Sequence, residues 1–476
     1  MRPPERHRRT LAFATLSVGV GAYALLQSLV MPVLNELAVR LDTTANSATW
    51  ILTGYLLSAS IFTPIMGRLG DIYGKKLLYV LALIALSVGS AIAALATSLP
   101  VMLAGRVVQG IGGGVLPLAF GIIRDIYPRP KVAGAVGLIA ALSAAGAGVG
   151  LVLAGPISAT LGESWLFWVP MLVVIATLCV AVFVVPRSTV RDPSSVNWVA
   201  AALLAGWLTA LLLALSEGPR TGWLSPWPIT LFIVAIVLTA AWIVREIRSP
   251  TPLIDMTIMR LRSVWSANIV ALLMGVGMYA AFGFVPQFLQ TPPSAGYGFG
   301  ASVTDAGLML LPLSVGMFIL GLFSGRLSDL IGARALIVIG SSISSIGYFL
   351  IAFCHSTELG IYLAMSLVGI GLGLAFSAMS NVVVGAVPQG SSGMASGMNA
   401  NIRTIGGAVG AATMASIVTA KSGIPTESQY VVGFAVLGIA VAIGSLAALA
   451  IPSTSVNKED ETQTRLQDAK MNSSRT

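Results

Sequence analysis

The sequence is poor in charge. Only 9% of its 476 residues are Asp, Glu, Lys or Arg, against about 25% in an average globular domain. Hydrophobic residues make up 56% of the chain, and the mean hydropathy is +0.89. A water-soluble fold could not cover its surface with so few charges, so we expect most of the surface to face lipid.

Cysteine and histidine are almost absent. Cys179, Cys354, His7 and His355 show neither metal-ligand spacing nor a disulfide framework. We therefore expect no metal, no cofactor, no catalytic residue and no enzyme activity. The net charge of +9 would suggest a nucleic-acid partner in a soluble protein. Here the basic residues lie in short loops between apolar runs, so no nucleic-acid partner is expected.

Long apolar runs dominate what remains, and a membrane helix needs about 20 such residues. Fourteen runs qualify, at 11–34, 48–66, 77–97, 101–123, 133–158, 166–186, 197–215, 227–245, 264–288, 305–324, 335–354, 359–384, 395–419 and 430–451. The first could be a signal peptide, but it exceeds the roughly 7–15 apolar residues of that class. Residues 1–10 are then a cytoplasmic N-terminus, and the polar residues 452–476 a disordered cytoplasmic tail.

The basic residues indicate an orientation. Of the 27 Lys and Arg residues, three fall on the side opposite the N-terminus, Arg40, Arg220 and Lys421, and two fall inside apolar runs, Arg106 and Arg403. All the others share the side of the N-terminus. Because positive loops stay in the cytoplasm, this bias predicts a multi-pass protein of the inner cell membrane with both termini cytoplasmic.

The chain also repeats itself over a long period. Gly67–Lys76 recurs as Gly325–Arg334 after 258 residues, and Gly110-Ile-Gly112 recurs as Gly369-Ile-Gly371 after 259. Both copies of the first motif follow the second helix of a six-helix block, so the repeat is parallel. The expected fold is an all-α polytopic membrane protein. Its bundles are 11–186 and 263–451, with two further transmembrane helices in the linker 187–262.

The repeated decapeptide has the form Gly-x-Leu-x-Asp-x-x-Gly-Lys-Lys in a short loop. Its glycines allow a tight turn, and Asp71 can cap a helix or pair with a base. An ordinary basic loop would need no second copy. The pattern resembles the loop signature of the major facilitator superfamily, in which this loop is a conformational latch. The resemblance implies latch roles for Gly67, Arg68, Asp71, Gly74 and Lys75, with Asp125 as an acidic partner, and for the second copy at Gly325, Asp329 and Gly332.

Arg106 lies inside the fourth apolar run, where a charge is costly and usually faces a cavity or the bundle interior. The alternative is that its side chain reaches the nearby surface. The segment resembles the superfamily's helix-4 motif, and the resemblance implies a role for Arg106 in coupling. The matching stretch of the second half has no arginine.

The fifth run carries Gly146, Gly148 and Gly150 and then Gly155-Pro156. This pattern resembles the helix-5 motif of the superfamily's antiporters and implies export, although Ala159-Thr160 stand where the family has paired glycines. The residues that carry this antiporter-like role are Gly150, Gly155 and Pro156. A kinked packing helix is the alternative.

Arg403 lies near the middle of the thirteenth run, close to Asn399. This stretch, together with Pro252–Asp255, resembles the fourteen-helix drug:proton antiporters. Many of those proteins carry an acidic residue at the position of Tyr23, so protons are a possible rather than a required partner here. The residues expected to line a central cavity are Tyr23, Gln27, Tyr55, Gln287, Asn399 and Arg403.

The expected function is export of small amphiphilic compounds, drugs or antibiotics, by alternating access, with proton coupling and a monomeric protein. A cavity with an arginine should accept neutral or anionic compounds more readily than cations. Two other classes remain open. One is uptake or uniport of a small metabolite. The other is a membrane sensor or a lipid-handling protein, and the absence of a sizeable soluble domain disfavours a sensor.

Overall fold

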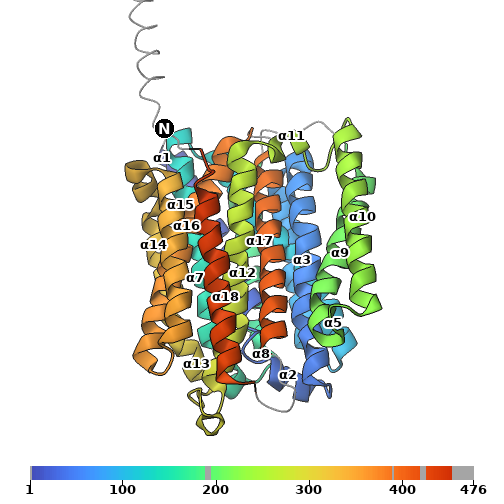
Figure 1. Cartoon of the computed structure of the whole chain (residues 1–476). Helices are drawn as coiled ribbons and strands as arrows, with labels where there is room; N and C mark the ends of the chain where they lie inside the picture. Colours follow the sequence, from blue (N-terminus) through green and yellow to red (C-terminus); the bar gives the residue numbers. More distant parts are fainter. Residues whose placement is uncertain (1–2, 188–194, 389–390, 419–424, 453–476) are drawn as a thin grey trace, which may run out of the picture.

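The structure is a computed structural model that describes residues 3–187, 195–388, 391–418 and 425–452. Within these ranges all regular elements are helices, and most run in one direction or its reverse through a single bundle (Figure 1). We call the end that carries the N-terminus and α11 the N-terminal face, and the other end the α2 face. Of the predicted tail 452–476, residues 453–476 lie outside the described residues.

The first half contains six long helical segments. Its elements are α1 (Pro3–Ser28), α2 (Leu34–Arg40), α3 (Ala45–Tyr73), α4 (Lys75–Ala94), α5 (Leu99–Gly110) continued by η1 (Ile111–Gly114) and α6 (Val115–Ile126), α7 (Arg129–Leu161) and α8 (Trp165–Val184). The first helix ends at Ser28 rather than at the predicted residue 34. Pro32 lacks a backbone N–H and disfavours helix in the residue before it, which explains the early end.

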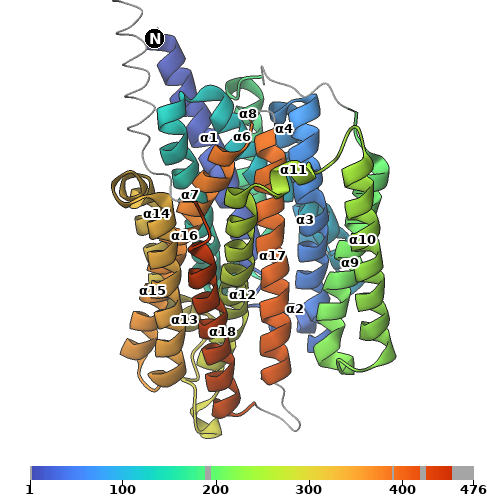
Figure 2. The same ribbon diagram turned by 45° about the horizontal axis from the view of Figure 1, so that its top comes forward.

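The inserted pair is α9 (Trp198–Thr221) and α10 (Pro226–Arg248), followed by the short α11 (Met256–Met259). It packs at one side of the bundle, as the green helices of Figure 2 show. In α10, only 22% of the most apolar stretch is buried inside the protein, so this helix presents most of its surface to lipid. The other member, α9, contacts both α3 and α17.

The second half repeats the plan of the first. Its elements are α12 (Arg262–Gln290), η2 (Pro293–Ala295), α13 (Val303–Met309) with α14 (Leu311–Ile331), α15 (Ala333–Phe353), α16 (Glu358–Ala386), α17 (Ser392–Ile417) and α18 (Glu427–Ala448). Gly74 and Gly332 occupy matching turns with φ of 108° and 85°. Such angles favour glycine, so the two copies of the motif share one backbone shape.

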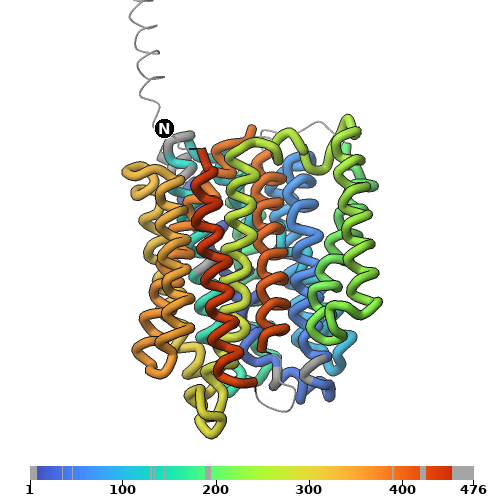
Figure 3. The backbone as a smooth tube through the Cα atoms, viewed as in Figure 1, coloured from blue at the N-terminus to red at the C-terminus, as the bar shows by residue number. Residues whose placement is uncertain are grey.

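Thirteen helical segments of the described chain are long and apolar enough to cross a membrane. The fourteenth prediction, 395–419, falls on α17. This helix has 26 residues, about 39 Å at 1.5 Å per residue, but its composition is too polar to count as a candidate span. It lies between α3 and α12 (Figure 3). The three helices are far apart from one another in the sequence. An interior helix can be polar because its side chains face protein rather than lipid.

Candidate functional site: a closed face, an open vestibule and an inner chamber

A buried charge network joins the ends of α3, α4 and α6 at the N-terminal face. The Lys75 Nζ donates to both carboxylate oxygens of Asp125 over 3.2 and 3.1 Å, and it lies 3.6 Å from Asp71 Oδ1. The side chains of Lys75 and Asp71 are fully buried. Buried charges are stable only when paired in this way, so the first decapeptide is held in one conformation.

The same network reaches across to the second half. Asp71 Oδ2 accepts a hydrogen bond of 3.1 Å from the backbone N–H of Met394, in the first turn of α17, where N–H groups are free and favour a negative charge. A Cβ placed on Gly67 would lie 2.5 Å from the carbonyl oxygen of Gly393. The two backbones therefore touch directly, and the N-terminal face is closed along this seam.

Arg124 makes a second connection between the halves that the sequence did not single out. Its Nη2 donates to the carbonyl of Val387 over 2.5 Å, and its Nη1 to that of Pro388 over 3.4 Å. Both carbonyls follow the last residue of α16, where carbonyl groups lack helical partners and attract a cation. From the sequence, Arg124 indicates only the orientation of the chain in the membrane, because its partners are 263 and 264 residues away.

The second copy of the decapeptide does not make a matching latch. Asp329 is exposed, and within the described residues the structure gives its side chain neither a hydrogen bond nor an ion pair. Gly325 faces Gly134 of α7, where an added Cβ would come within 3.3 Å of the Gly134 Cα. The latch role implied for Gly325, Asp329 and Gly332 therefore stays a prediction. Within the described residues, no contact of the Asp329 side chain supports it.

Arg106 is fully buried and does not reach the surface. Its Nε donates to the carbonyl of Ile51 over 3.1 Å and its Nη1 to Gln109 Oε1 over 2.9 Å. The guanidinium lies 4.4 Å from the centre of the Tyr55 ring, and Gln109 in turn donates to Ser90 over 2.8 Å. The charge of Arg106 is thus stabilised inside the first half by the Ile51 carbonyl, the Gln109 amide and the Tyr55 ring.

Tyr55 is predicted to line the central cavity, but the structure places it elsewhere. It is 1% exposed, packs against Arg106, and lines neither of the two main cavities described next. The physical reason is that a buried guanidinium is stabilised by an aromatic face. The sequence does not reveal that this tyrosine of α3 faces Arg106 of α5.

A vestibule opens between the halves at the α2 face. This cavity of about 720 Å³ is walled by α2 and the residues just before it, and by α3, α9, α12, α17 and α18. Gln287 lines it, as predicted for a cavity residue. Apart from Arg220 of α9, none of the described lining residues carries a charge. With the N-terminal face closed, the molecule is open toward the α2 face.

A smaller chamber of about 80 Å³ lies deeper, and Tyr23, Gln27 and Arg403 line it. Gln27 Nε2 donates to the hydroxyl of Tyr279 over 3.0 Å, and Tyr279 lines both chamber and vestibule. Tyr279 was missed by sequence reasoning because a tyrosine in an apolar run has no distinguishing pattern.

Arg403 is the charged residue of this chamber. Its guanidinium carbon lies 5.0 Å from the centre of the Phe376 ring, and its Nε is buried without a hydrogen-bond partner. Across the described residues its side chain forms no ion pair, and no Asp or Glu lines the chamber. The chamber therefore presents an uncompensated positive charge on an aromatic surface.

Asn399 lies next to this chamber but points away from its open part. Its Nδ2 donates to Asn268 Oδ1 of α12 over 2.9 Å, and both side chains are buried. Asn399 borders a third cavity of only about 10 Å³ beside Arg403. The pair joins α17 to α12 within the second half, so Asn399 has a structural partner that the sequence did not reveal.

Two glycines of the helix-5 motif, Gly148 and Gly155, lie where the two halves meet. A Cβ on Gly155 would lie 2.4 Å from Thr304 Oγ1, and one on Gly148 would overlap the side chain of Ser314. Gly150 instead faces Ser28 of α1. Small residues let helices approach closely in membranes, so α7 can pack on α1 with one face and on α13 and α14 with another.

Comparison with known proteins agrees with this architecture. The family model of the Major Facilitator Superfamily matches residues 16–411 and 267–473. The multidrug transporter protein MdtP of Bacillus subtilis is 27% identical over 383 residues, covering 79% of this chain and 69% of that protein. The multidrug resistance protein Stp of Mycobacterium tuberculosis is 28% identical over 421 residues, covering 87% and 76%.

A solved structure shares the fold. The crystal structure of the human organic anion transporter MFSD10 superposes with a TM-score of 0.66 at 17% identity, covering 94% of this chain and all of that one. At this identity the likeness concerns the fold alone. From the family match, the helical bundle and the closed and open faces, the chain belongs to the major facilitator superfamily and is a multi-pass membrane transporter, not an enzyme.

Proposed function

We propose that the protein exports small amphiphilic compounds that are neutral or anionic, by alternating access between its two halves. The observation that carries the charge preference is Arg403, which has no acidic partner in a chamber without Asp or Glu among its described lining residues. A buried cation favours an anionic or hydrogen-bond-accepting group and disfavours a second cation. The ring of Phe376 and the apolar walls suit the rest of such a molecule.

Support for export comes from the relatives of the chain. Relatives of the chain bear the names of multidrug transporters and resistance proteins. The excess of basic residues favours a cytoplasmic N-terminal face, so the vestibule would open to the outside, a state that exporters and importers share. The latch residues around Asp71 and Met394 would then hold the cytoplasmic side closed.

Proton coupling is the finer part of the proposal. No carboxylate lines the vestibule or the chamber in the described residues, so protons would act at the buried latch carboxylates Asp71 and Asp125. The same lack of a cavity carboxylate favours uniport as the second candidate function.

The test uses cells that express the protein and two fluorescent dyes of matched size, one anionic and one cationic. We expect lower accumulation of the anionic dye and little change for the cationic dye. Arg403→Gln should reduce export of the anionic dye about tenfold, whereas Arg248→Gln, an exposed residue of α10, should not. A strong cation preference would contradict the proposal, and a protonophore that leaves export unchanged would favour uniport.

A further inference from the structure

A second opening lies beside the vestibule, between α3 and the inserted hairpin of α9 and α10. This lateral groove has a volume of about 500 Å³. Its described lining residues are Trp50 of α3, Leu213, Glu217, Arg220 and Thr221 of α9, and Trp227 of α10. All of them belong to the first half or to the inserted pair, so no described residue of the second half lines the groove.

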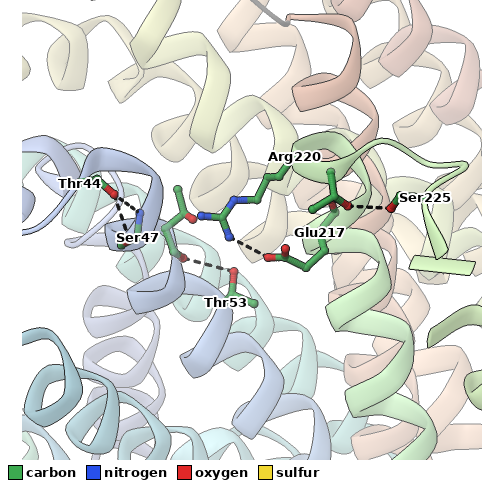
Figure 4. A network of polar contacts seen from close by, with 8 residues as sticks. Thr44, Ser47, Thr53, Glu217, Arg220 and Ser225 are labelled. Carbon is green, nitrogen blue, oxygen red and sulfur yellow. Dashed lines mark hydrogen bonds and ion pairs between the residues drawn. The ribbon is translucent and has the colours of Figure 1, made fainter. Parts of the chain in front are cut away.

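Arg220 lies between the groove and the vestibule, and we call it and its neighbours on α3 and α9 the wall between the two cavities. Arg220 lines both cavities, whereas Glu217 lines the groove. Arg220 Nη1 donates to Glu217 Oε1 over 2.8 Å, and its guanidinium carbon lies 6.0 Å from the centre of the Trp50 ring. Figure 4 shows the Arg220 side chain extending from α9 toward α3, with Glu217 beside it.

Three residues that line the vestibule beside Arg220 are small. Thr49 and Thr53 of α3 and Ser216 of α9 line the vestibule beside Arg220, and Thr53 is turned back onto its own helix by a hydrogen bond to the Thr49 carbonyl. Arg220 is therefore the residue that the two cavities share, and it lies beside the Trp50 ring between α3 and α9. A change of its rotamer would join the two cavities.

The groove lies at the depth of a membrane interface. Trp50 and Trp227 stand near the ends of the spans Ser47–Tyr73 and Pro226–Arg248, and Trp227 is 55% exposed. Tryptophan prefers the level of the lipid headgroups. An amphiphile could therefore hold its tail against lipid and the tryptophans while its head lies near Arg220.

We propose that this groove is a lateral opening of the substrate path, through which an amphiphilic anion passes between the vestibule and the adjoining membrane leaflet, with the Glu217–Arg220 ion pair as its gate. The anionic occupant rests on the proposed function. Arg220 is the charged residue among the described lining residues of the vestibule, so an anionic head there would compete with Glu217 for its guanidinium.

Labelling from the bilayer tests the opening without any transport. In a variant that lacks the exposed Cys179 and Cys354, Ser216→Cys places a thiol on the vestibule side of the wall. The probe is a maleimide attached to a phospholipid head in vesicles that hold the protein. We expect Arg220→Ala to raise the labelling rate at least tenfold, and the exposed Arg248→Ala on the same hairpin to leave it unchanged.

Equal labelling rates in the Arg220→Ala and Arg248→Ala variants would overturn the lateral opening. A water-soluble sulfonated maleimide should label Ser216→Cys in every variant, which shows that the vestibule is intact. Failure of this reagent would also overturn the proposal, because the wall would then have no vestibule behind it.

Transport separates this inference from the proposed function. Two fluorescent carboxylates share a head but differ in chain length, so that one stays in water and the other in the bilayer. We expect Arg220→Ala to change the ratio of their transport rates at least fivefold relative to Arg248→Ala. Transport of neither carboxylate by the unchanged protein would contradict the proposed function, while the labelling result would still decide the lateral opening.

Discussion

Gln27 of α1 donates a 3.0 Å hydrogen bond to the hydroxyl of Tyr279 of α12. The two residues belong to different halves, and Tyr279 lines both the outer vestibule and the inner chamber. The bond therefore bridges the halves at the level where one cavity meets the other. A molecule that moves from the vestibule to Arg403 would pass beside this contact.

Removing the bridge should make the chamber easier to reach. We expect Tyr279→Phe to raise the labelling rate of Ser143→Cys, a chamber residue, about fivefold with a water-soluble maleimide, because a hydrogen bond is worth about 1 kcal/mol. Tyr348→Phe is the control, since its buried hydroxyl has no partner in the described part of the chain. Equal rates in both variants would show that the bridge does not limit access.

Asp71 should be needed for transport and Asp329 should not. Asp71→Asn removes the negative charge that pairs with Lys75 and weakens the bond to the Met394 N–H, so we expect transport to fall at least tenfold. Asp329→Asn, at the matching but exposed position, should change it less than twofold. The measurement is dye export at equal amounts of folded protein, judged by size-exclusion chromatography in detergent. Full activity of Asp71→Asn would refute the latch assignment.

Arg106 should affect the rate of turnover rather than substrate binding. The residue lines neither of the two main cavities, yet it joins Ile51, Gln109 and the Tyr55 ring through one planar group. Lysine keeps the charge but cannot make these contacts together. For Arg106→Lys we expect the maximal export rate to fall about tenfold with KM within twofold of the original, and Arg248→Lys to change neither. A raised KM with an unchanged rate would place Arg106 in substrate binding instead.

Glu246 should stabilise the inserted pair. This buried carboxylate of α10 accepts hydrogen bonds from the backbone N–H groups of Leu253 and Ile254, over 2.8 and 3.1 Å, and from the Trp242 indole over 3.1 Å. Gln offers one acceptor oxygen, so Glu246→Gln should cost about 1–3 kcal/mol and lower the thermal unfolding midpoint in detergent. Glu358→Gln, at the N-terminus of α16, is the control for loss of charge. An unchanged midpoint would mean that these bonds contribute little.

Much of the fold follows from the sequence because lipid imposes simple rules on a chain. Runs such as 77–97 and 335–354 correspond to α4 and α15, since a lipid-facing helix must be apolar over its whole length. The helix α17 departs from this rule. It is rich in polar residues and glycines because it faces α3 and α12 rather than lipid, and its membrane passage remains a prediction from the alternation of the loops.

The site was less predictable, for a reason of geometry. Lys75 and Asp125 stand out as a basic and an acidic residue at loop ends, so their pairing could be expected. The partners Gln27 and Tyr279, or Asn268 and Asn399, come from helices 252 and 131 residues apart. Their contacts depend on how the helices are rotated about their axes, which a weak apolar period does not specify.

The asymmetry between the two decapeptides has a practical consequence. The first copy fastens the halves through Asp71 and Met394, whereas the second leaves Asp329 exposed on the same face. The duplicated loop is thus a spare attachment point. A fluorophore or affinity tag placed near Asp329 can report on the movement of the second half. It would leave intact the hydrogen bond between Asp71 and Met394 that joins the two halves.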